Sequence, residues 1–151
     1  MRSKLWVVVV LALALSALVG CGAAEPTAEP AKESSGPADL TIKGMVDKEV
    51  NLSIDDIKAL GTEEITSENS KGESETNEAV RLSKILDQAG VKDGAKTLVM
   101  TADDGYSAEV AMADLNPDCH VKFRSKGGIS TVMPGLPGNT WVKGVVTMEL
   151  K

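Results

Sequence analysis

Aromatic residues are scarce in this chain of 151 residues, which has two Trp, one Tyr and one Phe. Its Lys and Arg residues form no cluster interleaved with aromatic ones, and its formal net charge is −6. Surfaces that bind nucleic acids combine a basic patch with aromatic side chains on which bases stack. The sequence therefore predicts that nucleic acid is not a partner of this protein.

Cysteine and histidine are equally rare, since the chain holds only Cys21, Cys119 and His120. If Cys21 is modified as argued below, Cys119 has no partner for an intramolecular disulfide, and no cysteine-based zinc or iron–sulfur site can form. Adjacent residues of a strand point to opposite faces, so Cys119 and His120 are not expected to act as a dyad. We expect Cys119 to be buried rather than reactive. We expect His120 to be a surface or hydrogen-bonded residue rather than a ligand.

Familiar catalytic and nucleotide-binding motifs are missing as well. The chain contains no G-x-S-x-G, P-loop or dinucleotide-binding pattern, and its polar run at 68–78 lacks the spacing of a calcium loop. Asp103 and Asp104 are interpreted as turn residues rather than a catalytic pair. The glycine-rich segments 126–128 and 135–138 are interpreted as turns, with anion binding through backbone N–H groups as the alternative. We therefore predict no catalytic residue and no metal ligand.

The amino terminus carries an export pattern. Arg2 and Lys4 precede the uncharged apolar run 5–18, and small residues stand directly before Cys21. This order is typical of a secretory signal peptide, here residues 1–20. Its ending resembles the lipobox of bacterial lipoproteins, which implies cleavage before Cys21 and a diacylglycerol on its thiol. The alternative is an uncleaved transmembrane anchor, because about 20 apolar residues can span a bilayer.

Residues 22–39 are predicted to form a disordered tether. They hold three of the six prolines, with mostly small or charged residues between them, and such a composition cannot bury apolar surface. The folded domain is then 40–151, held at the extracytoplasmic face of a bacterial membrane. The acidic chain argues against direct binding to anionic lipid, so we expect membrane contact through the lipid on Cys21.

Hydrophobic periodicity predicts a mixed α+β domain with about eight short strands and two or three short helices. The clearest stretch is 79–110, with a helix over 82–89 that stops at Gly90 and a hairpin around the Asp-Gly turn 103–105. A solvated hairpin or loop is expected over 68–78. The remaining predicted strands are 40–46, with Met45 inward, and 49–52, 63–67, 119–123, 129–133 and 141–150, the last bent at Gly144. The other predicted helices are 54–60, capped by Ser53, and the single turn 112–116.

The order of three pieces is distinctive: VRLSKILDQAGVKDGAKTLVMTADDGYSAEVAMADL, a hairpin with a Gly-Gly turn, and MPGLPGNTWVKGVVTMEL. It resembles the oxidoreductase molybdopterin-binding domain, the fold first associated with sulfite oxidase, over most of 40–151. The resemblance implies a β-rich sulfite-oxidase-like fold and a site for a molybdenum–pterin cofactor. In that family, basic residues of the last Pro-Gly loop hold the pterin phosphate. Lys143 matches such a position, and Thr140 stands where an arginine is often found. Tyr106 and Trp141 could line the same pocket, with core packing as the alternative.

Catalytic members of that family bind molybdenum through a cysteine upstream of the helix that corresponds to 82–89. The corresponding region here, 66–70, reads TSENS. A hydroxyl cannot replace a polarisable thiolate at equal strength. We therefore expect a non-catalytic module that binds a small molecule or a partner protein, with no cofactor. The alternatives are a redox protein that keeps molybdopterin without a cysteine ligand, and an accessory subunit whose edge strand pairs with an extracytoplasmic redox complex.

The lipidation of Cys21 is directly testable. We expect the parent chain to incorporate labelled palmitate and Cys21→Ser to incorporate none, because the Cys21 thiol is the group that would carry the lipid. The matched control is Cys119→Ser, which should keep both the label and the membrane location. A parent chain that stays in the membrane without any palmitate label would instead support the transmembrane anchor.

Overall fold

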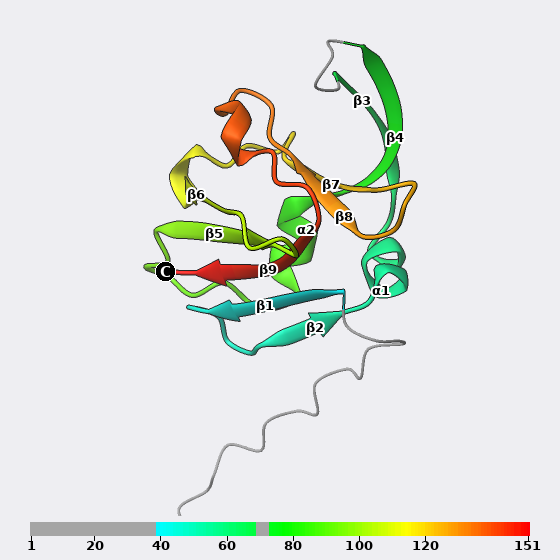
Figure 1. The fold of residues 1–151 in the computed structure, drawn as a ribbon. Helices are drawn as coiled ribbons and strands as arrows, with labels where there is room; N and C mark the ends of the chain where they lie inside the picture. Colours follow the sequence, from blue (N-terminus) through cyan, green and yellow to red (C-terminus); the bar gives the residue numbers. More distant parts are fainter. Residues whose placement is uncertain (1–38, 69–72) are drawn as a thin grey trace, which may run out of the picture.

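The structure, a computed structural model, describes residues 39–68 and 73–151, so the predicted signal peptide, Cys21 and all of the predicted tether except Asp39 lie outside the described residues. Asp39 belongs to the folded domain instead, because its N–H donates to the Leu52 carbonyl and its carboxylate accepts from the Ile54 N–H, both at 2.9 Å. The described chain forms two β-sheets with two short α-helices (Figure 1). Its strands are β1 Leu40–Gly44, β2 Val50–Leu52, β3 Glu63–Glu68, β4 Ser74–Arg81, β5 Thr97–Ala102, β6 Ser107–Ala111, β7 His120–Phe123, β8 Ile129–Val132 and β9 Val145–Leu150. Its helices are α1 Ile54–Ala59 and α2 Leu82–Asp87, with the 3-10 turns η1 Met112–Asp114 and η2 Gly138–Thr140.

The larger sheet has five strands in the order β2-β1-β9-β5-β6. The first and last strands of the described chain, β1 and β9, are neighbours in the middle of this sheet and run parallel to each other. All other neighbouring strands of the sheet are antiparallel. Alternating residues of these strands are fully buried, as for Ile42 on β1 and Met100 and Met148 on β5 and β9. Period-two alternation is the pattern of a sheet with one face on the core, and the strands of this sheet lie in the predicted segments, with different ends for β1 and β9.

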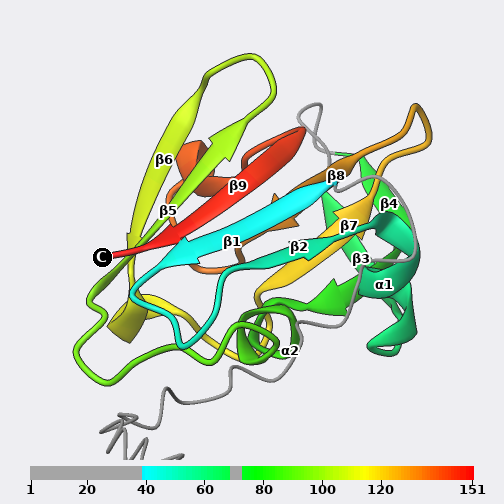
Figure 2. The same cartoon turned by 90° about the horizontal axis from the view of Figure 1, so that it is seen from below.

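The smaller sheet has four antiparallel strands in the order β3-β4-β7-β8 and lies to the right of the larger sheet in both views (Figures 1 and 2). The face towards the core carries Val80, Val121 and Ile129, all fully buried. Opposite residues of antiparallel strands share a face, so the register places a second, polar set on the other face of this sheet.

The two helices are short, and each is held in place by identifiable contacts. Ser53 caps α1 through a capping box in which its side chain accepts from the Asp56 N–H and the Asp56 carboxylate accepts from the Ser53 N–H. In α2, Leu82 and Ile85 are buried and hold the helix on the core. No helix in the described part of the chain is long and apolar enough to cross a membrane.

Several sequence predictions are corrected by the backbone. Met45 is 37% exposed while Val46 is buried, because Gly44 has a φ of +93° and turns the chain at the end of β1. The predicted final strand 141–150 begins only at Val145, because Gly144 has a φ of +72°, and residues 141–143 cross to the other sheet instead. The run 68–78 is a hairpin, since β3 and β4 extend into it, although its predicted tip lies outside the described residues.

Gly44 provides a test of how tightly β1 and β9 are paired. A Cβ on Gly44 would overlap the Leu150 carbonyl oxygen and lie 3.0 Å from the Leu150 nitrogen, whereas a Cβ on Gly105 would meet nothing within 4 Å. Both glycines have a positive φ, which costs an alanine about 1–2 kcal/mol. We expect Gly105→Ala to lose about that amount and Gly44→Ala clearly more, measured by thermal unfolding. Equal losses of stability in the two variants would show that the backbone at Gly44 can move to make room for a side chain, and that β1 and β9 are not tightly paired there.

Candidate functional site

Four cationic side chains line a groove on the polar face of the smaller sheet. We call it the polar groove; its volume is about 250 Å³. The cations come from three segments, namely β7, the turn after it and the stretch before β9. The lining residues are Glu75, Asn77, Lys122, Phe123, Arg124, Ser125, Lys126, Ser130 and Lys143.

Strand pairing explains why these residues meet. Lys122 on β7 is paired with Ser130 on β8, and Ser130 in turn forms an isolated antiparallel bridge with Lys143. The β7–β8 turn is closed by hydrogen bonds from the Arg124 N–H to the Gly128 carbonyl and from the Gly127 N–H to the Arg124 carbonyl, both 3.0 Å. The Gly-Gly pair thus makes the hairpin turn that the sequence predicted, and that turn holds the neighbouring cations over the groove.

The polar groove has an excess of positive charge. Its one carboxylate, Glu75, lies 3.2 Å from the Lys122 ammonium, and this hydrogen bond lowers the pKa of Glu75. The Lys122 side chain is only 19% exposed. Across residues 39–68 and 73–151, no carboxylate forms an ion pair with Arg124, Lys126 or Lys143. Arg124 nevertheless has a carboxylate nearby, since a Cβ on Gly144 would lie 3.0 Å from Arg124 Nη1 and 2.6 Å from Asp103 Oδ1. Lys126 and Lys143 therefore remain for an external anion.

The three predicted cofactor-binding residues do not share one site. Lys143 lines the polar groove, whereas Thr140 is buried and donates from its hydroxyl to the Pro137 carbonyl at 2.7 Å. Tyr106 is 46% exposed, so its packing in the core was a wrong alternative, and its hydroxyl donates to the Asn139 carbonyl at 2.8 Å. Trp141 packs partly buried against the core and donates from its indole N–H to the Met133 carbonyl. A cofactor role for Tyr106 and Thr140 stays a prediction.

Cys119 and His120 face different surroundings, as expected of neighbours on an extended chain. Cys119 is a free thiol, 2% exposed, and its sulfur lies 3.6 Å from the Asn116 side-chain oxygen. It lines an apolar pocket with Leu82 and Leu115, not the polar groove. The prediction of a buried cysteine is confirmed, and this thiol is not available to a ligand in the groove.

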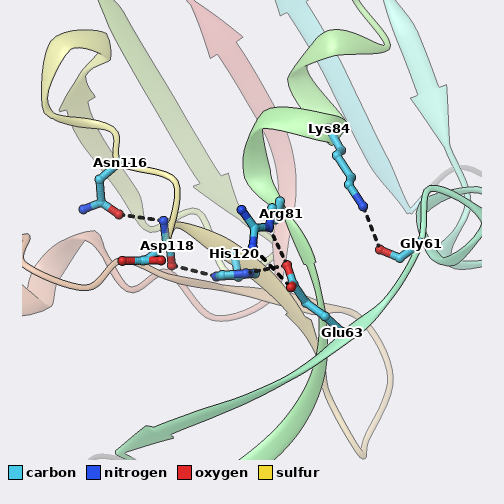
Figure 3. Close-up of polar contacts among 7 residues, drawn as sticks. All are labelled: Gly61, Glu63, Arg81, Lys84, Asn116, Asp118 and His120. Carbon is cyan, nitrogen blue, oxygen red and sulfur yellow. Dashed lines mark hydrogen bonds and ion pairs between the residues drawn. The ribbon is translucent and has the colours of Figure 1, made fainter.

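His120 is satisfied on both sides, in agreement with the sequence prediction. It is buried, and its Nδ1 lies 2.6 Å from the Asp118 carbonyl oxygen and its Nε2 3.0 Å from Glu63 Oε1 (Figure 3). Both neighbours are acceptors, so a protonated ring can donate to both and a neutral ring to only one. The same Glu63 accepts from Arg81 Nε at 2.7 Å. These contacts tie the edge strand β3 to β4 and β7.

Glu63 and Arg81 were missed by sequence reasoning. They lie 18 residues apart and His120 is 57 residues from Glu63, so no local spacing could reveal the cluster. Hydrogen bonds from Arg81 and then His120 lower the pKa of the Glu63 carboxyl to about 2. Only the register of β3, β4 and β7 brings the three side chains together.

The residues present do not fit a molybdenum–thiolate site. Cys119, the one cysteine of the described residues, is enclosed in the apolar pocket, and the described end of β3 offers Thr66, Ser67 and Glu68. Ser67 is buried, and its hydroxyl has no hydrogen-bond partner. In the described part of the chain, no three His, Cys, Asp or Glu side chains gather as a metal-binding group.

The Glu63 cluster predicts a specific loss of stability in acid. Its carboxyl has a folded-state pKa of about 2, below the ordinary 4.5, so its stabilisation is present above pH 4.5 and is lost as the pH falls towards 2. We expect Glu63→Gln to unfold at a lower temperature than the parent at pH 7, and this difference to shrink between pH 4.5 and 2. Glu64→Gln, the same change one residue along β3, should show no such convergence. A difference independent of pH would contradict this role.

Comparison with known proteins agrees with the fold. No protein-family model matches the sequence, and no curated protein matches it. Among solved structures, the sulfane dehydrogenase SoxCD from Paracoccus pantotrophus is similar, with a TM-score of 0.62 and 23% sequence identity over 74% of this chain. The match spans 37% of that longer chain. At this identity the similarity concerns architecture alone, and it supports the conclusion that the described domain has a distant sulfite-oxidase-like fold.

Proposed function

We propose that this protein is a bacterial lipoprotein whose sulfite-oxidase-like domain acts outside the cytoplasm as a non-catalytic module that binds a small ligand. One observation carries the binding role: the polar groove gathers four cations and one carboxylate, and it contains no thiol. A groove of this composition can attract and orient an anion. It offers no soft ligand that would hold molybdenum.

The separation of the thiol from the groove supports the non-catalytic part of the proposal. Cys119 lies among mostly apolar neighbours, and its thiol donates a hydrogen bond to the Asn116 side-chain oxygen. Moving this thiol to the groove would require breaking the core around α2, which contains Leu82 and Leu86. Substrate turnover by a metal centre is therefore not assigned to this chain.

The location rests on the amino-terminal sequence. The apolar run before Cys21 and the small residues beside it support export and lipidation. The prolines of 22–39 would hold the domain away from the bilayer as a tether. The groove would then face the extracytoplasmic medium, where small charged solutes are encountered.

A second candidate is a redox protein that keeps molybdopterin. Ser67 favours it, because this residue lies in the region of the family's metal ligand and has a buried hydroxyl without a partner. The register pairs Ser67 with Glu75, so both lie on the face of the polar groove. Lys143, which lines the same groove, would be the residue to hold the phosphate of such a cofactor. The structural similarity to a sulfane dehydrogenase is compatible with this candidate but extends to architecture alone.

Metal and pterin content separate the two candidates. The full-length chain is expressed in a bacterium that makes molybdopterin, extracted in mild detergent, and assayed for molybdenum and for pterin fluorescence after denaturation. We expect less than about one-tenth of an equivalent of either, because a hydroxyl is a poor substitute for the thiolate. The second candidate would be established by one molybdenum per chain in the parent, together with a lower molybdenum content in Lys143→Gln and an unchanged content in Lys92→Gln.

A further inference from the structure

The polar groove has the opposite charge to the chain that carries it. The sequence contains 22 acidic and 16 basic residues, yet the groove collects four basic residues around one acidic one. A neighbouring groove shares Arg124 and Lys126 but also contains Asp39 and Asp103, so its charges nearly balance. The positive potential is therefore concentrated on the side of Lys143.

The groove is built rather than scattered over the surface. Lys143 is fixed at its backbone by the bridge to Ser130, and Ser130 is itself only 3% exposed. Lys122 is mostly covered, and its ammonium is held in place by Glu75. Neutral hydrogen-bonding side chains, Asn77, Ser125 and Ser130, stand among the cations. Charged and neutral donors from β4, β7, the β7–β8 turn and the segment before β9 thus line one groove, a set that suits an anion with several acceptor oxygens.

Glu75 occupies a place that a ligand could take. Its carboxylate accepts from Lys122 at 3.2 Å, and its side chain is 51% exposed, so it can turn towards solvent without disturbing the core. The Glu75 carboxylate oxygen therefore lies beside the Lys122 ammonium, at a position that an oxygen of a bound anion could take. An incoming dianion would replace Glu75 and gain the attraction of Lys126 and Lys143 as well.

We propose that the polar groove binds a small molecule carrying a tetrahedral dianion, a phosphate or sulfate group, through its four cations and in competition with the Glu75 carboxylate. The volume of about 250 Å³ limits the ligand to a small solute. This proposal rests on the proposed binding function and names its ligand class. It concerns a soluble ligand that exchanges with the medium, so it needs no metal.

The test titrates the full-length chain in a non-ionic detergent with inorganic phosphate, pyrophosphate, glycerol 3-phosphate and sulfate by calorimetry. The salt concentration is kept at about 20 mM, because screening weakens exposed charge interactions. We expect saturable binding of one equivalent of at least one of these probes. Tighter binding of glycerol 3-phosphate than of phosphate would indicate that the ligand is a phosphate ester. Tighter binding of phosphate would indicate that it is the free ion.

Two charge-matched variants locate the binding. Lys126→Gln/Lys143→Gln should weaken affinity about tenfold or more, since two close charges are removed. Lys92→Gln/Lys96→Gln removes the same charge from exposed lysines outside the groove and should change affinity less than about twofold. Equal weakening in both would show that only net charge matters and would overturn the proposal.

Glu75 gives a test in the opposite direction. Glu75→Gln should bind the probe about threefold to tenfold more tightly, because Lys122 is released from its internal partner. Glu78→Gln, on the other face of β4, should leave affinity nearly unchanged. Weaker binding by Glu75→Gln, or no saturable binding of any probe at about 10 mM, would overturn the proposal. The molybdenum assay is independent of this result, so failure of the non-catalytic function and failure of the anion site are distinguishable.

Discussion

The pairing of β9 between β1 and β5 is the constraint on which the other features depend. It joins the two ends of the domain in one sheet, and the close approach at Gly44 leaves no room for a side chain. The residues just before β9 must then cross to the smaller sheet, which they do by bridging Lys143 to Ser130. The same pairing that completes the core thus delivers a cation to the polar groove.

The two faces of the smaller sheet differ in composition. One face carries fully buried apolar residues such as Val80 and Val121. The other face carries the Glu63–Arg81–His120 cluster near one end and the polar groove near the turn after β7. His120 is the buried member of this cluster, and a buried polar group is costly unless it is hydrogen-bonded, so both of its ring nitrogens have partners within the fold. Lys126 and Lys143 of the groove are exposed, so they need no internal partner.

A sulfite-oxidase-like architecture does not carry its chemistry with it. The fold positions strands and loops, whereas metal binding needs a thiolate at one particular place, and here the described thiol is enclosed on a different part of the core. What the scaffold retains is a groove with hydrogen-bond donors and positive charge. Binding of an anion without a metal requires only these features.

The sequence by itself determined the elements with strong local patterns. The α2 stripe, the Asp-Gly hairpin, the Ser53 cap and the Gly-Gly turn are each set by neighbours within a few residues, and all were found close to their predicted positions. The amino-terminal export pattern is likewise local. Only the tertiary structure decided that Met45 and Tyr106 are exposed, that Glu63 meets His120, and that Lys143 joins Lys122 and Arg124. These outcomes depend on strand register and on where the chain crosses between the two sheets. Both are set by contacts between distant segments, which leave no periodic pattern in a single sequence.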